Sequence, residues 1–104
     1  MEIVRVQESC VAPIAHGTLE IDTSQHSITI FLNAVPAHSE TECLTIRKIT
    51  DDKNTVTVAG NEVMIDDAEF LIFGLHKQAK VSHGKNTAIV LRATHTGWKI
   101  IAEY

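Results

Sequence analysis

Six histidines are the residues that first suggest chemistry, because imidazole is the commonest metal ligand and a frequent general base. Protein metal sites often show two histidines one helical turn or one strand period apart. None of the six has another histidine at such a distance, and five fall in expected loops. The pattern favours solvated loop residues, and no metal ligand is predicted, although symmetry around an axis could gather histidines from several copies. The six are His16, His26, His38, His76, His83 and His95.

Two pairs of adjacent aspartates could act as general acid and base if a cleft gave their carboxyls different pKa values. Asp66 and Asp67 follow an expected strand, and Asp51 and Asp52 precede another. Aspartate in such positions also hydrogen-bonds its own backbone and so favours turns. Turn roles are the stronger interpretation for both pairs, and no catalytic residue is predicted.

Nucleophile and cofactor motifs are missing from the sequence. The serines lack the strand–turn–glycine setting of a hydrolase, and the five glycines are too scattered to form a phosphate-binding loop. Cys10 and Cys43 are expected to be buried free thiols in a reducing compartment, while a disulfide between them stays open on spacing alone. We therefore expect no cofactor and no enzyme activity, and a small metal-dependent or cupin-like enzyme is the remote alternative.

Composition sets the outer limits on function. The 104 residues are enough for one domain, and the net charge of −4 argues against a nucleic-acid partner, which normally requires a clustered basic face. No apolar run reaches the roughly 20 residues needed to cross a bilayer. The opening "MEIVRVQESC" has no signal-peptide pattern, which predicts synthesis in a cytoplasm and no membrane attachment.

Strand periodicity dominates the chain. Apolar residues alternate with polar ones in 27–32, 44–46 and 55–58, which is typical of half-buried strands. The segments 68–73 and 87–93 are more uniformly apolar and could be covered on both faces. Only one stretch, "LHKQAK" (75–80), could form a helical turn.

Turn residues recur every 8–12 positions, which predicts short connections between these strands. The segment 50–54 suits a hairpin loop, Gly60-Asn61 suits a two-residue primed turn, and 82–86 and 94–97 suit two more hairpins. The long polar stretch 33–42 is the expected crossover between sheets.

The predicted fold is all-β: a single antiparallel β-sandwich or barrel-like domain, jelly-roll-like in character. Residues 1–16 are expected to form an N-terminal strand or arm, and 17–104 the sandwich. There is no convincing internal repeat.

Several residues could recognise a partner at the surface. Lys77, Lys80 and Lys85 form a small basic patch, for which a solvated face is the default and an anion or glycan contact the sharper alternative. His83 and His95 lie in the neighbouring hairpin loops. Trp98 is favoured as a core aromatic of the last strand, with sugar stacking or partner anchoring as the alternative.

The linear order of these pieces resembles a β domain of bacteriophage virions that recurs in tail fibres, tail spikes and small capsid decoration proteins. That domain runs from "D-T-S" through a strand ending in Leu-Pro, then "T-I-K-K", a polar hairpin, "N-T-V-T-I", a glycine turn, "I-D-G" and a final tryptophan strand. The resemblance covers about residues 17–102. The matching positions are Asp22-Thr23-Ser24, Thr45-Ile46-Arg47-Lys48, Asn54 to Val58, Ile65-Asp66 and Trp98.

Two positions depart from that pattern. Asn33 stands where the family has proline, and Asp67 stands where it has glycine. The second departure predicts that the turn either avoids positive φ or carries strain. The resemblance implies a trimeric β assembly that acts by adhesion and has no catalytic group.

Physical chemistry also predicts self-association. An open sandwich leaves unpaired backbone groups on its edge strands, and a lone domain can cover only one face of the apolar run 70–73. A cyclic neighbour could cover the other face, so a homo-oligomer of closed symmetry is expected, and the family resemblance favours three copies over two. The predicted interface residues are Phe70, Leu71, Ile72 and Phe73, together with Ile3, Val4 and Val6.

The leading functional prediction is a capsid decoration (cement) protein that binds the major capsid protein, or another virion protein, on the phage head. The chain starts at its own methionine and shows no shaft segment, which favours a self-contained module, and residues 1–7 are the candidate arm lent to a neighbour. The alternative is a tail-fibre or receptor-binding tip in which loops 82–86 and 94–97 contact a host surface glycan. Both place the mature protein in the virion.

Overall fold

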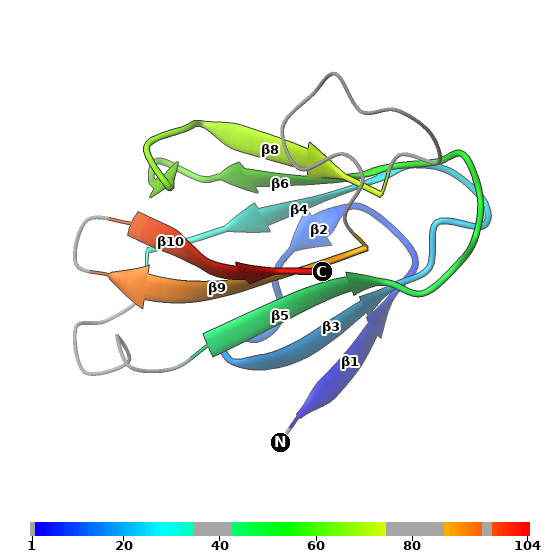
Figure 1. Cartoon of the computed structure of the whole chain (residues 1–104), viewed down its shortest axis with the longest axis horizontal. Helices are drawn as coiled ribbons and strands as arrows, with labels where there is room; N and C mark the ends of the chain where they lie inside the picture. Colours follow the sequence, from blue (N-terminus) through cyan, green and yellow to red (C-terminus); the bar gives the residue numbers. More distant parts are fainter. Residues whose placement is uncertain (1, 35–42, 75–86, 95–96) are drawn as a thin grey trace.

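The computed structural model describes residues 2–34, 43–74, 87–94 and 97–104, and these residues form an all-β structure with no helix (Figure 1). The described strands make two sheets that enclose one hydrophobic core. The six-stranded sheet has the order β1 (Ile3–Val6), β3 (Gly17–Ile21), β5 (Cys43–Lys48), β9 (Ala88–Thr94), β10 (Gly97–Glu103) and β7 (Met64–Ile65). The four-stranded sheet has the order β2 (Cys10–Val11), β4 (Ile28–Leu32), β6 (Val56–Gly60) and β8 (Phe70–Phe73).

Both sheets are mixed, which corrects the antiparallel and jelly-roll-like prediction. From β1 to β6 the chain passes alternately from one sheet to the other, so that β1, β3 and β5 lie parallel, as do β2, β4 and β6 (Figure 1). Among the described strands, the antiparallel ladders are those that join β8 to β6, β9 to β5 and β10 to β9. A period of two is common to both kinds of sheet, and a turn signal does not reveal whether the chain folds back beside its last strand or crosses to the other layer.

The crossing chain produces a structural repeat that the sequence analysis did not detect. Thr18 pairs with Thr45, 27 positions later, and Ile28 pairs with Val56, 28 positions later. Side chains at the corners repeat with the same spacing: Asn61 Nδ2 donates to Asn33 Oδ1 at 2.8 Å. Two successive coils of the chain therefore lie on one another, and they share the alternation and a few matching residues such as Asn33 and Asn61.

The core confirms the predicted alternation. Ile28, Ile30 and Leu32 are fully buried while Phe31 between them is exposed, and the alternate residues of β5 and β6 behave in the same way. In β8 the outward positions are Phe70, which is exposed, and Ile72, which is half-buried, so this strand is apolar on both sides and its inner side is the one that the described residues bury fully.

Three turn predictions have different outcomes. The segment 50–54 crosses between the sheets from β5 to β6, so the predicted hairpin is wrong. Gly60-Asn61 is not a two-residue hairpin either: Gly60 ends β6, and a Cβ there would collide with the carbonyl oxygen of Val63, which explains the glycine. The hairpin at 94–97 is confirmed, because Thr94 pairs with Gly97 in the antiparallel β9–β10 ladder.

Other predictions concern segments beyond the described residues. The helical turn at 75–80 and the hairpin at 82–86 both lie outside them. The crossover at 33–42 is confirmed by its ends, since β4 and β5 belong to different sheets. No helix among the described residues is long and apolar enough to cross a membrane.

Candidate functional site

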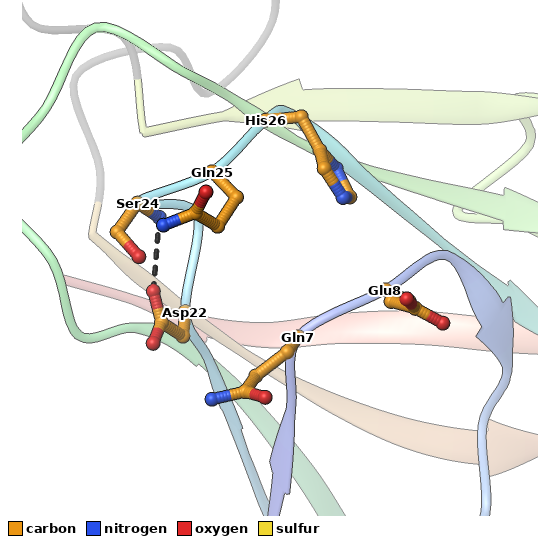
Figure 2. A pocket seen from close by; sticks show the side chains of 6 residues that line it. All are labelled: Gln7, Glu8, Asp22, Ser24, Gln25 and His26. Atoms are coloured by element: carbon orange, nitrogen blue, oxygen red, sulfur yellow. Dashed lines mark hydrogen bonds between the residues drawn. The ribbon is translucent and has the colours of Figure 1, made fainter.

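A pocket lined by titratable groups lies where two connections between the sheets meet. It has a volume of about 560 Å³ and is lined by Gln7 and Glu8 from one connection and by Asp22, Ser24, Gln25 and His26 from the other. Figure 2 shows the Glu8 carboxylate directed away from Asp22, so the two acids do not converge on one point. The pocket therefore does not bring its two carboxylates together.

Asp22 in this pocket is engaged locally. Its Oδ1 accepts a hydrogen bond from the Ser24 backbone N–H at 2.9 Å, the Asx-type turn that aspartate favours (Figure 2). Hydrogen bonds from the Ser24 side chain and backbone lower the pKa of Asp22, with smaller contributions from Gln7 and the charge of Arg5. The carboxylate thus stays ionised and holds its own turn.

Metal binding receives no support from the described residues, among which no three His, Cys, Asp or Glu side chains are placed to share an ion. His26 is exposed, with its Nδ1 3.0 Å from the Ser27 carbonyl oxygen. His38, His76, His83 and His95 lie outside the described residues. Cys10 and Cys43 are free thiols, as predicted, but each is only partly buried, and this burial raises the pKa of Cys10.

A buried lysine organises the end of the molecule where β5 leaves its sheet. Lys48 is 8% exposed, and its Nζ donates to the carbonyl oxygens of Asp52 (2.7 Å), Asn54 (2.6 Å) and Gly74 (2.9 Å). Its charge is balanced by Asp52 Oδ1 at 3.2 Å. One ammonium group therefore ties the β5–β6 connection to the end of β8.

Asp52 links that lysine to the preceding coil. Its Oδ1 accepts from Thr23 Oγ1 at 2.8 Å, the Thr23 and Thr50 hydroxyls lie 2.9 Å apart, and Asn54 Nδ2 donates to the Thr23 carbonyl at 2.7 Å. Partial burial acts to raise the pKa of Asp52. Hydrogen bonds from Thr50, Thr23 and Lys48, with the lysine charge, outweigh it, so the pKa of Asp52 lies below its usual value. We call Thr23, Lys48, Thr50, Asp52 and Asn54 the lysine cluster.

The second aspartate pair forms the turn that was preferred over catalysis. Asp66 and Asp67 have φ values of 50° and 69°, and Ile65 and Ala68 exchange both backbone hydrogen bonds across them. Positive φ at both central positions is the mark of a type I′ turn. Of the two outcomes predicted for Asp67 in place of glycine, strain is therefore the correct one.

The predicted interface residues of β8 divide between core and surface. Leu71 and Phe73 fill the core of the single chain, so these two side chains are not available to a neighbour, and predicting them at an interface was wrong. Phe70 is 52% exposed and Ile72 is half-buried on the outer side. β8 is also an edge strand, so its outer backbone groups have no sheet partner among the described residues.

The residues of β1, an edge strand of the six-stranded sheet, are likewise divided between the core and the surface. Val6 is buried, which corrects its placement at an interface, Val4 packs against the core, and Ile3 is 60% exposed. β1 pairs with β3 of its own chain and β2 pairs with β4, so residues 3–6 and 10–11 are built into the two sheets in the single chain.

Trp98 is a core side chain, 4% exposed, which confirms the preferred interpretation and excludes surface recognition by its ring. Its Nε1 donates to the Asn33 carbonyl at 3.0 Å, so Asn33, the residue in place of the family's proline, joins β4 to β10. The other predicted recognition residues, Lys77, Lys80, Lys85, His83 and His95, lie outside the described residues.

The comparisons with known proteins identify no relative. The sequence matches no family model, and no curated protein or solved structure matches it significantly.

The lysine cluster was not anticipated as a unit. A signal for it existed, since Thr23 and Thr50 are 27 positions apart, the same offset as the β3–β5 register, but that offset has no meaning until the parallel pairing is known.

Proposed function

We propose that this protein is a structural component of a bacteriophage virion, a decoration protein that binds the head surface as a homotrimer. The order of motifs from Asp22 to Trp98 supports the viral assignment through its resemblance to virion β domains. The two-layered all-β fold is compatible with that resemblance.

The observation that carries the proposal is the pair of strand edges, each with an exposed apolar side chain, that the described part of the chain leaves without a sheet partner. Phe70 on edge strand β8 and Ile3 on edge strand β1 are 52% and 60% exposed. Each large apolar group removed from water contributes about 25 cal/mol per Å² of buried area. Unpaired edge strands also invite pairing or cover by another chain. Self-association would bury the apolar side chains and would also cover the unpaired strand edges. Closed cyclic symmetry is the commonest form of self-association.

A trimer suits adhesion to a repetitive surface. Three identical copies present three identical contacts, and simultaneous contacts raise the effective affinity well above that of one. Individual contacts with the capsid can therefore be weak.

The test is to locate the protein on the particle. Electron microscopy of virions, with and without a fusion label on this chain, should place three copies together on the head surface. Heads lacking the protein should rupture at lower temperature and recover when purified protein is added. Label on the tail alone would contradict the proposal and favour the receptor-binding tip.

A further inference from the structure

The outer face of the six-stranded sheet carries a central stripe of uncharged side chains. Register places Ile3 beside Thr18, Thr18 beside Thr45, and Thr45 beside Val90, and paired residues of neighbouring strands point to the same face. Ala102 continues the row on β10. Small and β-branched side chains of this kind give a flat surface suited to contact with protein.

Cations flank this stripe on both sides. Arg5 and Arg47 lie in the row on one side, with Glu20 between them, and Arg92 lies in the row on the other. All three are exposed, and only Arg5 has an ion pair with a described residue, at 3.7 Å to Glu20. We call this surface, the stripe with Arg5, Arg47 and Arg92, the basic face. In this chain of net charge −4, other exposed acidic side chains lie away from this face.

Exposed acidic side chains are concentrated between β6 and β8. Residues 61–70 contain four exposed acids and no cation, and Met64 and Phe70 in the same segment are 43% and 52% exposed. We call residues 61–70 the acidic corner. The four acids are Glu62, Asp66, Asp67 and Glu69. Lys99 lines a pocket with Asp66 and Asp67, so it belongs to the surroundings of this corner and is left out of the basic face.

The acidic corner and the β1 end of the basic face lie toward opposite edges of the six-stranded sheet, because β7 is one edge strand and β1 is the other, while Arg92 in β9 is two strands from β7. Figure 1 shows the connection between β6 and β8 at the upper left and strands β1, β3 and β5 at the lower right. Each surface has apolar or uncharged groups surrounded by charge, as in protein interfaces with an apolar centre and a polar rim. The charges are of opposite sign. Contact of like with like would bring four acids of one copy against four of another, which is unfavourable.

We infer that copies of this chain associate head to tail, with the acidic corner of one copy seated on the basic face of the next. Phe70 and Met64 lie over the stripe of Ile3, Thr45 and Val90, and the corner carboxylates face Arg47 and Arg92, whose guanidinium groups bind carboxylates in a bidentate manner. Such an interface is heterologous and closes into a ring when its rotation is 120°. The inference rests on the homotrimer of the proposed function and assigns its interface.

Charge reversal tests the inference. The basic-face variant carries Arg47→Glu and Arg92→Glu, the corner variant carries Glu62→Lys and Glu69→Lys, and a third chain carries all four changes. The control reverses two exposed charges outside both surfaces, with Lys53→Glu and Glu8→Lys. Mass is measured by light scattering over a range of concentrations, and circular dichroism verifies that each chain is folded.

Each double variant should need about 10–100 times more protein for half-assembly than the wild type, since attraction becomes repulsion. The fourfold variant should recover most of that loss, because the charges are again complementary, and the control should match the wild type. If folded double variants assemble like the wild type, the head-to-tail interface is wrong while the trimer stands. If the fourfold variant does not regain assembly, the loss of assembly in the double variants has another cause, and the assigned head-to-tail interface is wrong. A monomeric wild type at every concentration overturns both this interface and the proposed trimer, whereas head location is decided separately on virions.

Discussion

The lysine cluster and the acidic corner are both polar, but they use their polar groups in opposite ways. In the lysine cluster, Lys48 places three hydrogen bonds on backbone carbonyls, and Asp52 neutralises its charge. In the acidic corner, the four acids are exposed, and Glu62, Asp66 and Asp67 all have positive φ. One region satisfies its charge internally, and the other presents charge outward on a strained backbone.

The difference separates groups that hold the fold from groups that are free to meet a partner. A buried charge is tolerated only when neighbouring groups satisfy it, so substitution in the lysine cluster should lower the stability of the fold. Exposed acids with little internal bonding contribute little to folding, so substitution in the corner should alter assembly and leave the monomer folded. The predictions below test this separation, starting with the largest effect.

Replacing Lys48 with methionine should produce the largest loss of stability. One buried and two part-buried carbonyl oxygens would lose their donor and Asp52 its counter-charge, which should lower the free energy of unfolding by about 3–5 kcal/mol. Urea denaturation monitored by circular dichroism measures the change. The control is Lys53→Met, since Lys53 is exposed and should change stability by less than about 0.5 kcal/mol. Equal stability of the two variants would contradict the structural role of the cluster.

Replacing Asp52 with asparagine should have a smaller effect that depends on pH. The folded pKa of Asp52 is lowered, so its contribution is complete above the unfolded pKa of about 3.9 and is lost as pH falls through the lower folded value. At neutral pH the variant should lose about 1–3 kcal/mol, because Lys48 keeps its hydrogen bonds but loses its charge partner.

The pH profile distinguishes this charge effect from a packing effect. Unfolding free energies measured from pH 7 down to pH 2 should converge for wild type and variant in acid. A constant difference across that range would show that the Asp52 charge does not stabilise the folded state.

The smallest effect is expected from Asp67→Gly in the acidic corner. Glycine adopts the φ of 69° without steric cost, so stability should rise by about 0.5–1 kcal/mol. Glu69→Gly is the matched control, because Glu69 has no positive φ and glycine there only adds freedom to the unfolded chain. Thermal unfolding of both variants measures the difference, and destabilisation by Asp67→Gly would argue against strain at this turn.

Much of the local structure could be predicted, because burial depends on the two-residue period. The alternation of Ile28, Ile30 and Leu32, the core position of Trp98 and the turn at Asp66-Asp67 all follow from neighbouring residues alone. Strand direction could not be predicted, since a crossover such as 49–55 and a hairpin loop use the same turn residues.

The surfaces were predicted less well for the same reason. The local apolar runs were enough to place Phe70 and Ile3 at the surface. Alternate residues of a strand face opposite sides, and only the packing of the sheet shows that Leu71, Phe73 and Val6 belong to the buried side. The basic face depends on register between strands far apart in sequence, such as Arg47 in β5 and Arg92 in β9, and no local pattern reveals it.

The mass of the purified protein in solution tests the central claim most directly. Light scattering over a range of micromolar concentrations should give three times the 11.5 kDa chain mass, with dissociation favoured by high salt because opposite charges meet at the interface. A stable species of 11.5 kDa at every concentration would show that one chain tolerates its exposed edges alone.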